Sequence, residues 1–258
     1  MTDSRSQEKV LHQIALLKAA GVKPVVVHGG GPMIGELFKV SGIESEFIDG
    51  HRITLKKSME VVEQALSGKV NGLLVNRLNR LNAKAVGLSG KDSRMVTAIK
   101  RAYSRKTEKG SEEVDLGFVG DVRHVNTDLL KLLLKSEYLP VISPVSAGED
   151  GEDYNINADM FAGHIAGALK AKAFIAITNV DGLMKDPDRA ETKIQSISPD
   201  EVKALFGTVI KGGMIPKIEA CLIAIGKGVE ACHIVNGSTK DSILNQLFSE
   251  IKAGTTVH

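Results

Sequence analysis

Short apolar runs alternate with amphipathic stretches along most of the chain. The runs are short enough to be strands that are buried on both faces of a sheet, and the stretches between them repeat apolar residues at helical spacing. The clearest runs are Val25–Val27, Lys84–Leu88, Leu139–Ile142, Ala173–Thr178 and His233–Val235. Strands that alternate with helices predict an α/β protein, here a three-layer α/β/α sandwich with a mainly parallel central sheet.

The first amphipathic stretch, Ser6–Ala20, has apolar residues at Val10, Leu11, Ile14 and Leu17. This spacing predicts a helix that ends near Gly21. A parallel βαβ unit needs a strand on each side of its helix, and the residues before Ser6 have no strand pattern. We therefore expect the first helix to lack a preceding strand.

Several other elements can be placed from the pattern. Asp49-Gly50 is typical of the turn of a β-hairpin. Phe118–Val125 alternates like an edge strand. The expected elements are the hairpin at Glu46–Thr54, helices at Lys57–Leu66, Lys69–Leu81 and Asn157–Leu169, and the edge strand at Phe118–Val125. A loop rich in Pro and Gly, Pro144–Gly151, is the expected boundary between two lobes of a single domain, residues 1–147 and 148–258.

Composition and charge exclude several classes of protein. The chain is 43% hydrophobic and 25% charged, with a net charge of +2, which is ordinary for a globular protein and too small to indicate a nucleic-acid partner. No apolar run approaches the roughly 18 residues of a membrane span, and residues 1–9 do not have the pattern of a signal peptide. We expect a cytoplasmic protein without a membrane partner. Cys221 and Cys232 are expected to be buried free thiols.

The candidate chemistry begins at Val25–Pro32, where a buried strand is followed by three glycines and a proline. Proline is favoured in the first turn of a helix, and glycines let backbone N–H groups approach a ligand closely. The positive end of the helix dipole then favours phosphate or carboxylate. The segment therefore predicts an anion site.

Common nucleotide motifs do not explain this segment. A dinucleotide fingerprint needs glycine where Ile34 stands. Gly87–Asp92 has the wrong glycine spacing for a P-loop and no Ser or Thr after Lys91. The sequence also has no nucleophile elbow, no zinc-ligand spacing and no protein-kinase catalytic loop.

A set of blocks in this order resembles the amino-acid kinase family: Val25–Pro32 (VVVHGGGP), Gly50–Thr54 (GHRIT), Val86–Asp92 (VGLSGKD), Asn155–Asp159 (NINAD) and Gly212–Lys217 (GGMIPK). The resemblance extends from about residue 20 to the end of the chain. GHRIT favours the branch of the family that phosphorylates N-acetyl-L-glutamate.

The resemblance implies transfer of the ATP γ-phosphoryl group to the side-chain carboxylate of N-acetyl-L-glutamate, a step of arginine biosynthesis. It implies an acceptor and dimerisation lobe at residues 1–147, a nucleotide-binding lobe at residues 148–258, and a homodimer. Mg²⁺ would be held mainly by the nucleotide phosphates and water, so no protein ligand is expected. An acceptor such as an aminoadipate derivative stays open, because one methylene changes binding by only about 1–3 kcal/mol.

The resemblance also implies the site residues. Lys217 would stabilise charge on the phosphoryl group and Asp159 would orient the catalytic lysines, beside backbone contacts from Gly29 and Gly30. Acceptor binding is implied for Gly30, Gly31, Arg52 and Asn155, and nucleotide binding for Thr178, Asn179, Val180, Gly182, Gly213, Met214 and Lys217. The Ser89–Asp92 turn would shape the acceptor pocket through its backbone.

Simpler interpretations of the charged and polar residues remain. Arg52 could be an exposed hairpin arginine, Asp159 could interact only with a helix dipole, and Lys217 could be a solvated helix lysine. Asn157, next to the site, could be only a helix N-cap.

The sequence departs from the family at two places. The family opens with a strand ending in Lys-x-Gly-Gly, which is absent here, and Lys9 has no glycine near it. Asn179 stands where the family usually has aspartate. A truncated or mis-started chain, a binding protein with little catalytic activity, and a partner that supplies the strand are the alternatives for the first departure. We favour truncation, because the other site residues are present.

Overall fold

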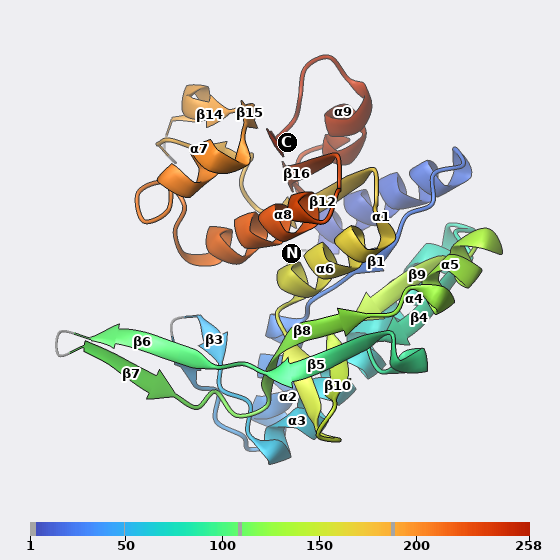
Figure 1. Cartoon of the computed structure of the whole chain (residues 1–258). Coiled ribbons are helices and arrows are strands. Elements are labelled where there is room, and N and C mark those ends of the chain that lie inside the picture. Colours follow the sequence, from blue (N-terminus) through green and yellow to red (C-terminus); the bar gives the residue numbers. More distant parts are fainter. Residues whose placement is uncertain (1–3, 49, 108–109, 187–188) are drawn as a thin grey trace.

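The computed structural model describes residues 4–48, 50–107, 110–186 and 189–258 (Figure 1). Asp49, expected in the hairpin turn, lies outside the described residues. Two sheets form the centre of the molecule. The first contains β1 (Val26–Val27), β9 (Leu139–Ser143) and β4 (Ala85–Ser89) in the order β1-β9-β4, with both pairs parallel.

The second sheet has the order β12-β16-β17-β15. The strands β12 (Ala173–Thr178) and β16 (Ala231–Asn236) are parallel, β17 (Thr255–Val257) is antiparallel to β16, and β15 (Ser196–Ile197) is parallel to β17. Parallel pairs predominate in the two sheets, as the apolar runs predicted.

Helices cover both faces of this sheet layer. On one face, α1 (Ser4–Ala19), α4 (Asn71–Arg80) and α9 (Ser242–Phe248) pack against residues from both sheets, including Val141 and Val235. On the other face, α6 (Ala158–Leu169) contacts the first sheet through Phe161 and the second through Ala166. The predicted α/β/α layers are confirmed, and α6 lies at the centre (Figure 1).

The two sheets have open edges toward each other. Among the described residues, β1 pairs only with β9, and β12 pairs only with β16. Because α6 begins beside the carboxyl end of β1 and leads back into β12, the two edge strands run in the same direction.

A closed four-stranded barrel lies beside the first sheet. Its order is β10-β11-β8-β5, formed by β10 (Val145–Gly148), β11 (Asp153–Ile156), β8 (Val119–Val125) and β5 (Val96–Lys100). The prediction that Phe118–Val125 is an edge strand is wrong, because β8 is bonded on both sides. Burial along β8 does not alternate: the neighbours Val119 and Gly120 are both buried, and the neighbours Arg123 and His124 are both exposed.

The remaining elements surround these layers. The helix α3 (Lys56–Glu63) continues through a π-helical segment (Gln64–Val70) into α4, where the sequence predicted two separate helices. The others are α2 (Gly31–Val40), the hairpin β2 (Phe47–Ile48) and β3 (His51–Arg52), the projecting hairpin β6 (Tyr103–Thr107) and β7 (Gly110–Val114), α5 (Asp128–Lys135), β13 (Leu183–Met184), β14 (Lys193–Ile194), α7 (Pro199–Ala204) and α8 (Ile215–Gly226), with short 3₁₀ turns at Asp92–Arg94, Ala190–Thr192 and Gly212–Met214 (Figure 1).

No helix among the described residues combines the length and the apolar character needed to cross a bilayer. Cys221 and Cys232 are free and buried, as predicted.

Candidate active site

The glycine turn connects β1 to α2, with Pro32 in the first turn of the helix. A Cβ on Gly30 would lie 2.7 Å from Leu66 Cδ2 and 3.1 Å from Val70 Cγ2, so a larger residue does not fit there. A Cβ on Gly29 would lie 3.5 Å from the Cβ of Ala158, which begins α6. The first N–H groups of a helix have no partner within it, so this turn can donate hydrogen bonds to an anion.

Arg52 is held at the same turn by the β2–β3 hairpin. Its Nη2 donates to the Gly31 carbonyl at 3.2 Å, and its Nη1 donates to Ser45 Oγ. The guanidinium also lies over the rings of Phe47 and Phe38, at 4.5 and 5.3 Å from the ring centroids. Arg52 is therefore not a solvated hairpin arginine, and its planar group can bind a carboxylate with two hydrogen bonds.

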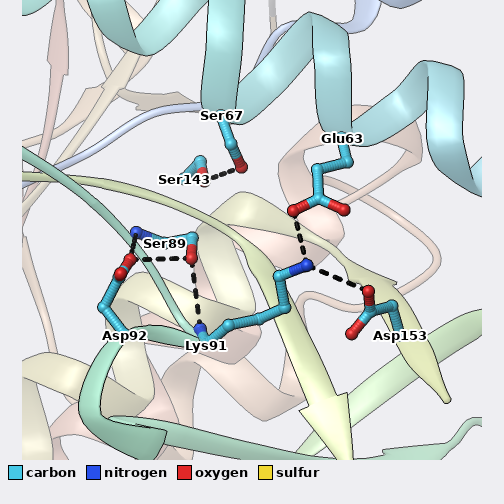
Figure 2. Close-up of polar contacts among 7 residues, drawn as sticks. All are labelled: Glu63, Ser67, Ser89, Lys91, Asp92, Ser143 and Asp153. Atoms are coloured by element: carbon cyan, nitrogen blue, oxygen red, sulfur yellow. Dashed lines mark hydrogen bonds and ion pairs between the residues drawn. The ribbon is translucent and has the colours of Figure 1, made fainter.

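Lys91 ties the turn after β4 to its neighbours (Figure 2). Its Nζ lies 2.5 Å from Glu63 Oε1 on α3 and 3.0 Å from Asp153 Oδ2 on β11. Burial lowers the pKa of Lys91, but the hydrogen bonds and charges of Glu63 and Asp153 outweigh burial and raise it. Asn155 is two residues after Asp153 and so faces the same side of β11. The lysine thus anchors the strand that carries Asn155.

The turn itself is closed by Asp92, whose Oδ2 accepts from the N–H and the hydroxyl of Ser89 at 2.6 and 2.8 Å (Figure 2).

Asn157 and Asp159 lie at the start of α6. The Asn157 Oδ1 accepts from the N–H groups of Asp159 and Met160 at 3.0 and 3.1 Å, so Asn157 is the helix N-cap. Asp159, in the first turn, uses both carboxylate oxygens to accept hydrogen bonds from Lys217 Nζ, at 3.0 and 2.9 Å. Asp159 therefore does more than interact with the helix dipole.

The Lys217–Asp159 pair is half-buried, with side-chain exposures of 18% and 25%. It is fixed by the close packing of α6 on α8. A Cβ on Gly163 would lie 2.6 Å from the Ala220 carbonyl oxygen and 2.9 Å from the Ala220 Cα. Because Gly163 and Ala220 are each about one helical turn beyond the ion pair, this backbone contact sets the distance between the two charged side chains.

The predicted nucleotide segment follows β12. Thr178 is buried at the end of the strand, its carbonyl accepts from Gly237 N at 2.9 Å, and Asn179 next to it is exposed. Gly182 has a φ of +112°, and a Cβ there would lie 2.9 Å from Thr255 N, so only glycine fits. The end of β12 and the final strand are thus in contact.

The residues that contact the segment after β12 were not among those predicted from the sequence. Asn236, at the end of β16, donates from Nδ2 to Asp181 Oδ1 at 2.8 Å, and Thr239 Oγ1 lies 3.4 Å from the same oxygen. A usable signal existed: Asn236 ends the strand run that begins at His233, and the carboxyl ends of neighbouring parallel strands meet at one edge of a sheet.

Gly213 and Met214 belong to the 3₁₀ turn just before α8. Met214 packs partly against the hydrophobic core, whereas Gly213 is exposed, with no atom within 4 Å of the position of a Cβ. Contacts within the chain therefore do not require glycine at position 213.

Lys9 lies on α1, where its Nζ donates to the Ser238 carbonyl at 2.8 Å.

The structure thus brings much of the predicted site together. Arg52 contacts Gly31 of the glycine turn, Gly29 approaches Ala158 at the start of α6, and the adjacent Asp159 pairs with Lys217. The turn, which can donate hydrogen bonds, thus lies near the N-termini of α2 and α6, with Arg52 bonded to it and Lys217 paired with Asp159 in the first turn of α6. Such a site is suited to phosphoryl transfer, which depends mainly on positioning and charge stabilisation.

No group of three or more His, Cys, Asp or Glu side chains that could hold a metal ion occurs within the part of the chain that the structure describes. A magnesium ion that accompanied a nucleotide here would take most of its oxygen ligands from phosphates and water.

Comparison with known proteins agrees with this geometry. The sequence profile of the amino acid kinase family matches residues 1–236. A curated relative from Methanocaldococcus jannaschii, named acetylglutamate kinase, is 45% identical over 259 residues, which cover 100% of this chain and 86% of the relative.

Solved structures have the same fold. The protein smu.665 from Streptococcus mutans UA159 is 29% identical, with a TM-score of 0.76 over 96% of this chain and 90% of that one. Carbamate kinase from Giardia lamblia, bound to AMP-PNP, is 17% identical, with a TM-score of 0.67 over 100% and 92%. The sequence blocks, the layered fold and the match over nearly the whole chain lead to one conclusion: the chain belongs to the amino acid kinase family.

Proposed function

We propose that this chain transfers the γ-phosphoryl group of ATP to the side-chain carboxylate of N-acetyl-L-glutamate, giving an acyl phosphate in arginine biosynthesis. The full-length similarity to the acetylglutamate kinase of M. jannaschii supports the substrate. The observation that carries the proposal is the arrangement in which Arg52 bonds to the glycine turn, Gly29 lies near the start of α6, and Asp159 at the start of α6 pairs with Lys217.

The reaction needs little proton chemistry. The acceptor carboxylate is already ionised at neutral pH, so its oxygen attacks the γ-phosphorus directly while the bond to the ADP oxygen breaks. Backbone N–H groups of Gly29, Gly30 and Gly31 stabilise the transferred group. Lys217 neutralises the developing charge, and Asp159 holds its Nζ in place.

The proposal extends to acceptor binding. Arg52 binds the α-carboxylate and Asn155 the acetamido region, because one group offers paired donors and the other both donates and accepts. Thr178, Asn179, Val180, Gly182, Gly213 and Met214 border ATP. Residues 1–147 then form the acceptor and dimerisation lobe and residues 148–258 the nucleotide lobe, in a cytoplasmic homodimer whose ATP carries Mg²⁺.

The test combines ADP release with chemical trapping of the product. Purified chain, ATP, Mg²⁺ and N-acetyl-L-glutamate are incubated with hydroxylamine, which converts an acyl phosphate to a coloured hydroxamate. We expect equal amounts of ADP and hydroxamate. Lys217→Ala should lower kcat about 10²–10³-fold, as the loss of one preorganised charge typically does.

Lys203→Ala is the matched control, because Lys203 forms a surface pair with Asp200 on α7 and should leave kcat unchanged. ADP release without hydroxamate would contradict acyl transfer. Acceptor binding measured by calorimetry without any turnover would instead indicate a binding protein. Higher kcat/KM with an aminoadipate derivative than with N-acetyl-L-glutamate would correct the acceptor.

A further inference from the structure

The π-helical segment Gln64–Val70 lies directly under the glycine turn. Leu66 and Val70 fill the space that a side chain at Gly30 would need. Ser67, between them, forms a hydrogen bond of 2.7 Å with Ser143 at the end of β9 (Figure 2). π-Helical turns are rare and are frequently found at functional sites, which directs attention to the residue that follows the segment, Asn71.

The side chain of Asn71 contacts β9, β4 and His28, the residue that follows β1. Its Nδ2 lies 2.9 Å from the Val141 carbonyl oxygen on β9, 3.0 Å from His28 Nε2 and 3.3 Å from the Leu88 carbonyl oxygen on β4. Asn71 and His28 are only 4% and 8% exposed. An amide has two N–H donors, so the two shorter contacts are its main hydrogen bonds.

The neighbouring strand is adapted to this amide. A Cβ on Gly87 would lie 2.1 Å from Asn71 Oδ1, so β4 has glycine at the point where the amide sits. The amide therefore occupies a place that the surrounding backbone leaves open for it.

The contacts determine the protonation of His28. Burial lowers its pKa, so the ring is neutral near pH 7. His28 Nδ1 lies 3.0 Å from the Gly29 carbonyl oxygen, which can only accept, so Nδ1 carries the hydrogen and donates it. Nε2 then has no hydrogen and accepts from Asn71. One network thus runs from Asn71 through His28 to the glycine turn.

We propose that Asn71 is a positioning residue for phosphoryl transfer. By keeping His28 in the Nδ1–H form, it holds the Gly29 carbonyl toward the ring and leaves the N–H groups of the turn facing the transferred phosphoryl group. This inference rests on the proposed function, because it assigns the glycine turn to the reacting phosphate. A misplacement of about 1 Å in such a cradle can cost about 10²-fold in rate.

The chain contains a matched control in Asn79, on the same helix. Its Nδ2 donates to the Ala85 carbonyl at 3.0 Å, and its Oδ1 accepts from Ala85 N at 2.6 Å. Asn79 thus also anchors α4 to β4, but at the amino end of the strand, away from the glycine turn. Loss of the anchor between α4 and β4 should lower the stability of both Asn71→Ala and Asn79→Ala. Loss of positioning at the glycine turn should lower kcat only in Asn71→Ala.

The experiment compares Asn71→Ala, Asn71→Asp and Asn79→Ala in the hydroxamate assay. Asn71→Ala should lower kcat about 10–100-fold, with the KM for ATP changed by less than about 3-fold. Asn79→Ala should keep kcat within about 2-fold while its urea midpoint falls about as much as that of Asn71→Ala. Asn71→Asp, which keeps the size but draws a second proton onto His28, should lose kcat similarly.

A second measurement does not depend on activity. Nitrogen-15 NMR of the intact chain should show His28 protonated at Nδ1 and unprotonated at Nε2 at pH 7, and protonated at both in Asn71→Asp. Protonation of His28 at Nε2 in the parent chain, or equal loss of kcat in the Asn71→Ala and Asn79→Ala variants, would overturn the inference.

Failure of the proposed function gives a different result. If the parent chain makes no hydroxamate from N-acetyl-L-glutamate, the substrate assignment fails, and the NMR result still decides the His28 network. If Asn71→Ala does not fold, His28→Asn takes its place: it keeps a donor for Gly29 and removes the acceptor for Asn71. It should show the same loss of kcat, and unchanged kcat would overturn the inference.

Discussion

The ion pair between Lys217 and Asp159 fixes the position of the lysine ammonium group without using all of its hydrogen-bond donors. An ammonium group has three donors, and the two oxygens of Asp159 accept from it at 2.9 and 3.0 Å. A further donor remains for a phosphoryl oxygen. The carboxylate therefore orients the lysine and leaves one of its donors available, so the ion pair is compatible with the role in phosphoryl transfer that we propose for Lys217.

A second residue, His233, makes the stability of the fold depend on pH. His233, on β16, accepts from Gln246 Nε2 at 3.1 Å, so its Nδ1 has no room for a proton. Burial, with smaller contributions from Lys252 and His258, lowers the pKa of His233 from 6.5 to about 4. Between these values the unfolded chain binds more protons than the folded chain, so stability falls as the pH falls.

We expect the free energy of unfolding to fall by roughly 1–2 kcal/mol on this account between pH 7 and pH 5. Urea titrations at both values should show a smaller decrease for His233→Gln than for the parent chain. An equal decrease in the two proteins would assign the pH dependence to other groups, of which His164 is the first to examine because burial and Lys227 lower its pKa to about 4.

At the scale of elements, the site depends on how closely α6 and α8 pack. Gly163 lets the two helix backbones approach, and the ion pair lies about one turn away toward their N-termini. Asp159 lies on α6 and Lys217 on α8, so the two side chains can form their ion pair only when the two helices are in contact.

Gly163→Ala should therefore affect both stability and rate. The added Cβ overlaps the Ala220 backbone, and such overpacking costs about 1–3 kcal/mol. The helices must shift to relieve it, so we expect kcat to fall about 10-fold or more along with the urea midpoint.

Gly226→Ala is the control for this substitution. Gly226 ends α8 with no atom within 4 Å of a Cβ position, so alanine should be neutral or stabilising by up to about 1 kcal/mol. If Gly163→Ala matched this control in stability and kcat, the packing argument would be wrong.

At the scale of the whole molecule, the described strands divide the sheet layer into two sheets, and we call the space between their edge strands β1 and β12 the gap. The described strands β1 and β12 have open, parallel edges, while α1 on one face and α6 on the other face contact both sheets. A strand between them would gain backbone hydrogen bonds on both sides and would end next to the glycine turn. The family resemblance implies a first strand ending in Lys-x-Gly-Gly, and we expect such a strand to fit here.

A strand fused ahead of α1 and ending in Lys-x-Gly-Gly should fill the gap. We expect it to slow hydrogen exchange of the β1 and β12 amides and to raise kcat about 10²–10³-fold above the same fusion with Met in place of Lys. Both fusions should gain equal stability. Unchanged exchange in β1 and β12 with either fusion would show that the gap does not accept a strand in this way.

The sequence alone determined the layered architecture and most of the local structure. Apolar runs with β-branched residues predicted the parallel strands, and Asn157 predicted the start of α6, because these signals depend on neighbouring residues only. The order of the five blocks was likewise enough to indicate the family. The glycine turn could be recognised as an anion site because strand, glycines and proline are adjacent in the chain.

Only the tertiary structure decided which distant residues meet. The Lys217–Asp159 pair, the Asn71–His28 network and the Asn236–Asp181 contact each join residues far apart in the sequence, and helix or strand periodicity carries no information about such pairs. The barrel that contains β8 could not be predicted for the same reason, since alternation in the sequence shows which faces of a strand are buried but not which strands are its neighbours. Local pattern fixes the elements, while side-chain packing between them builds the site.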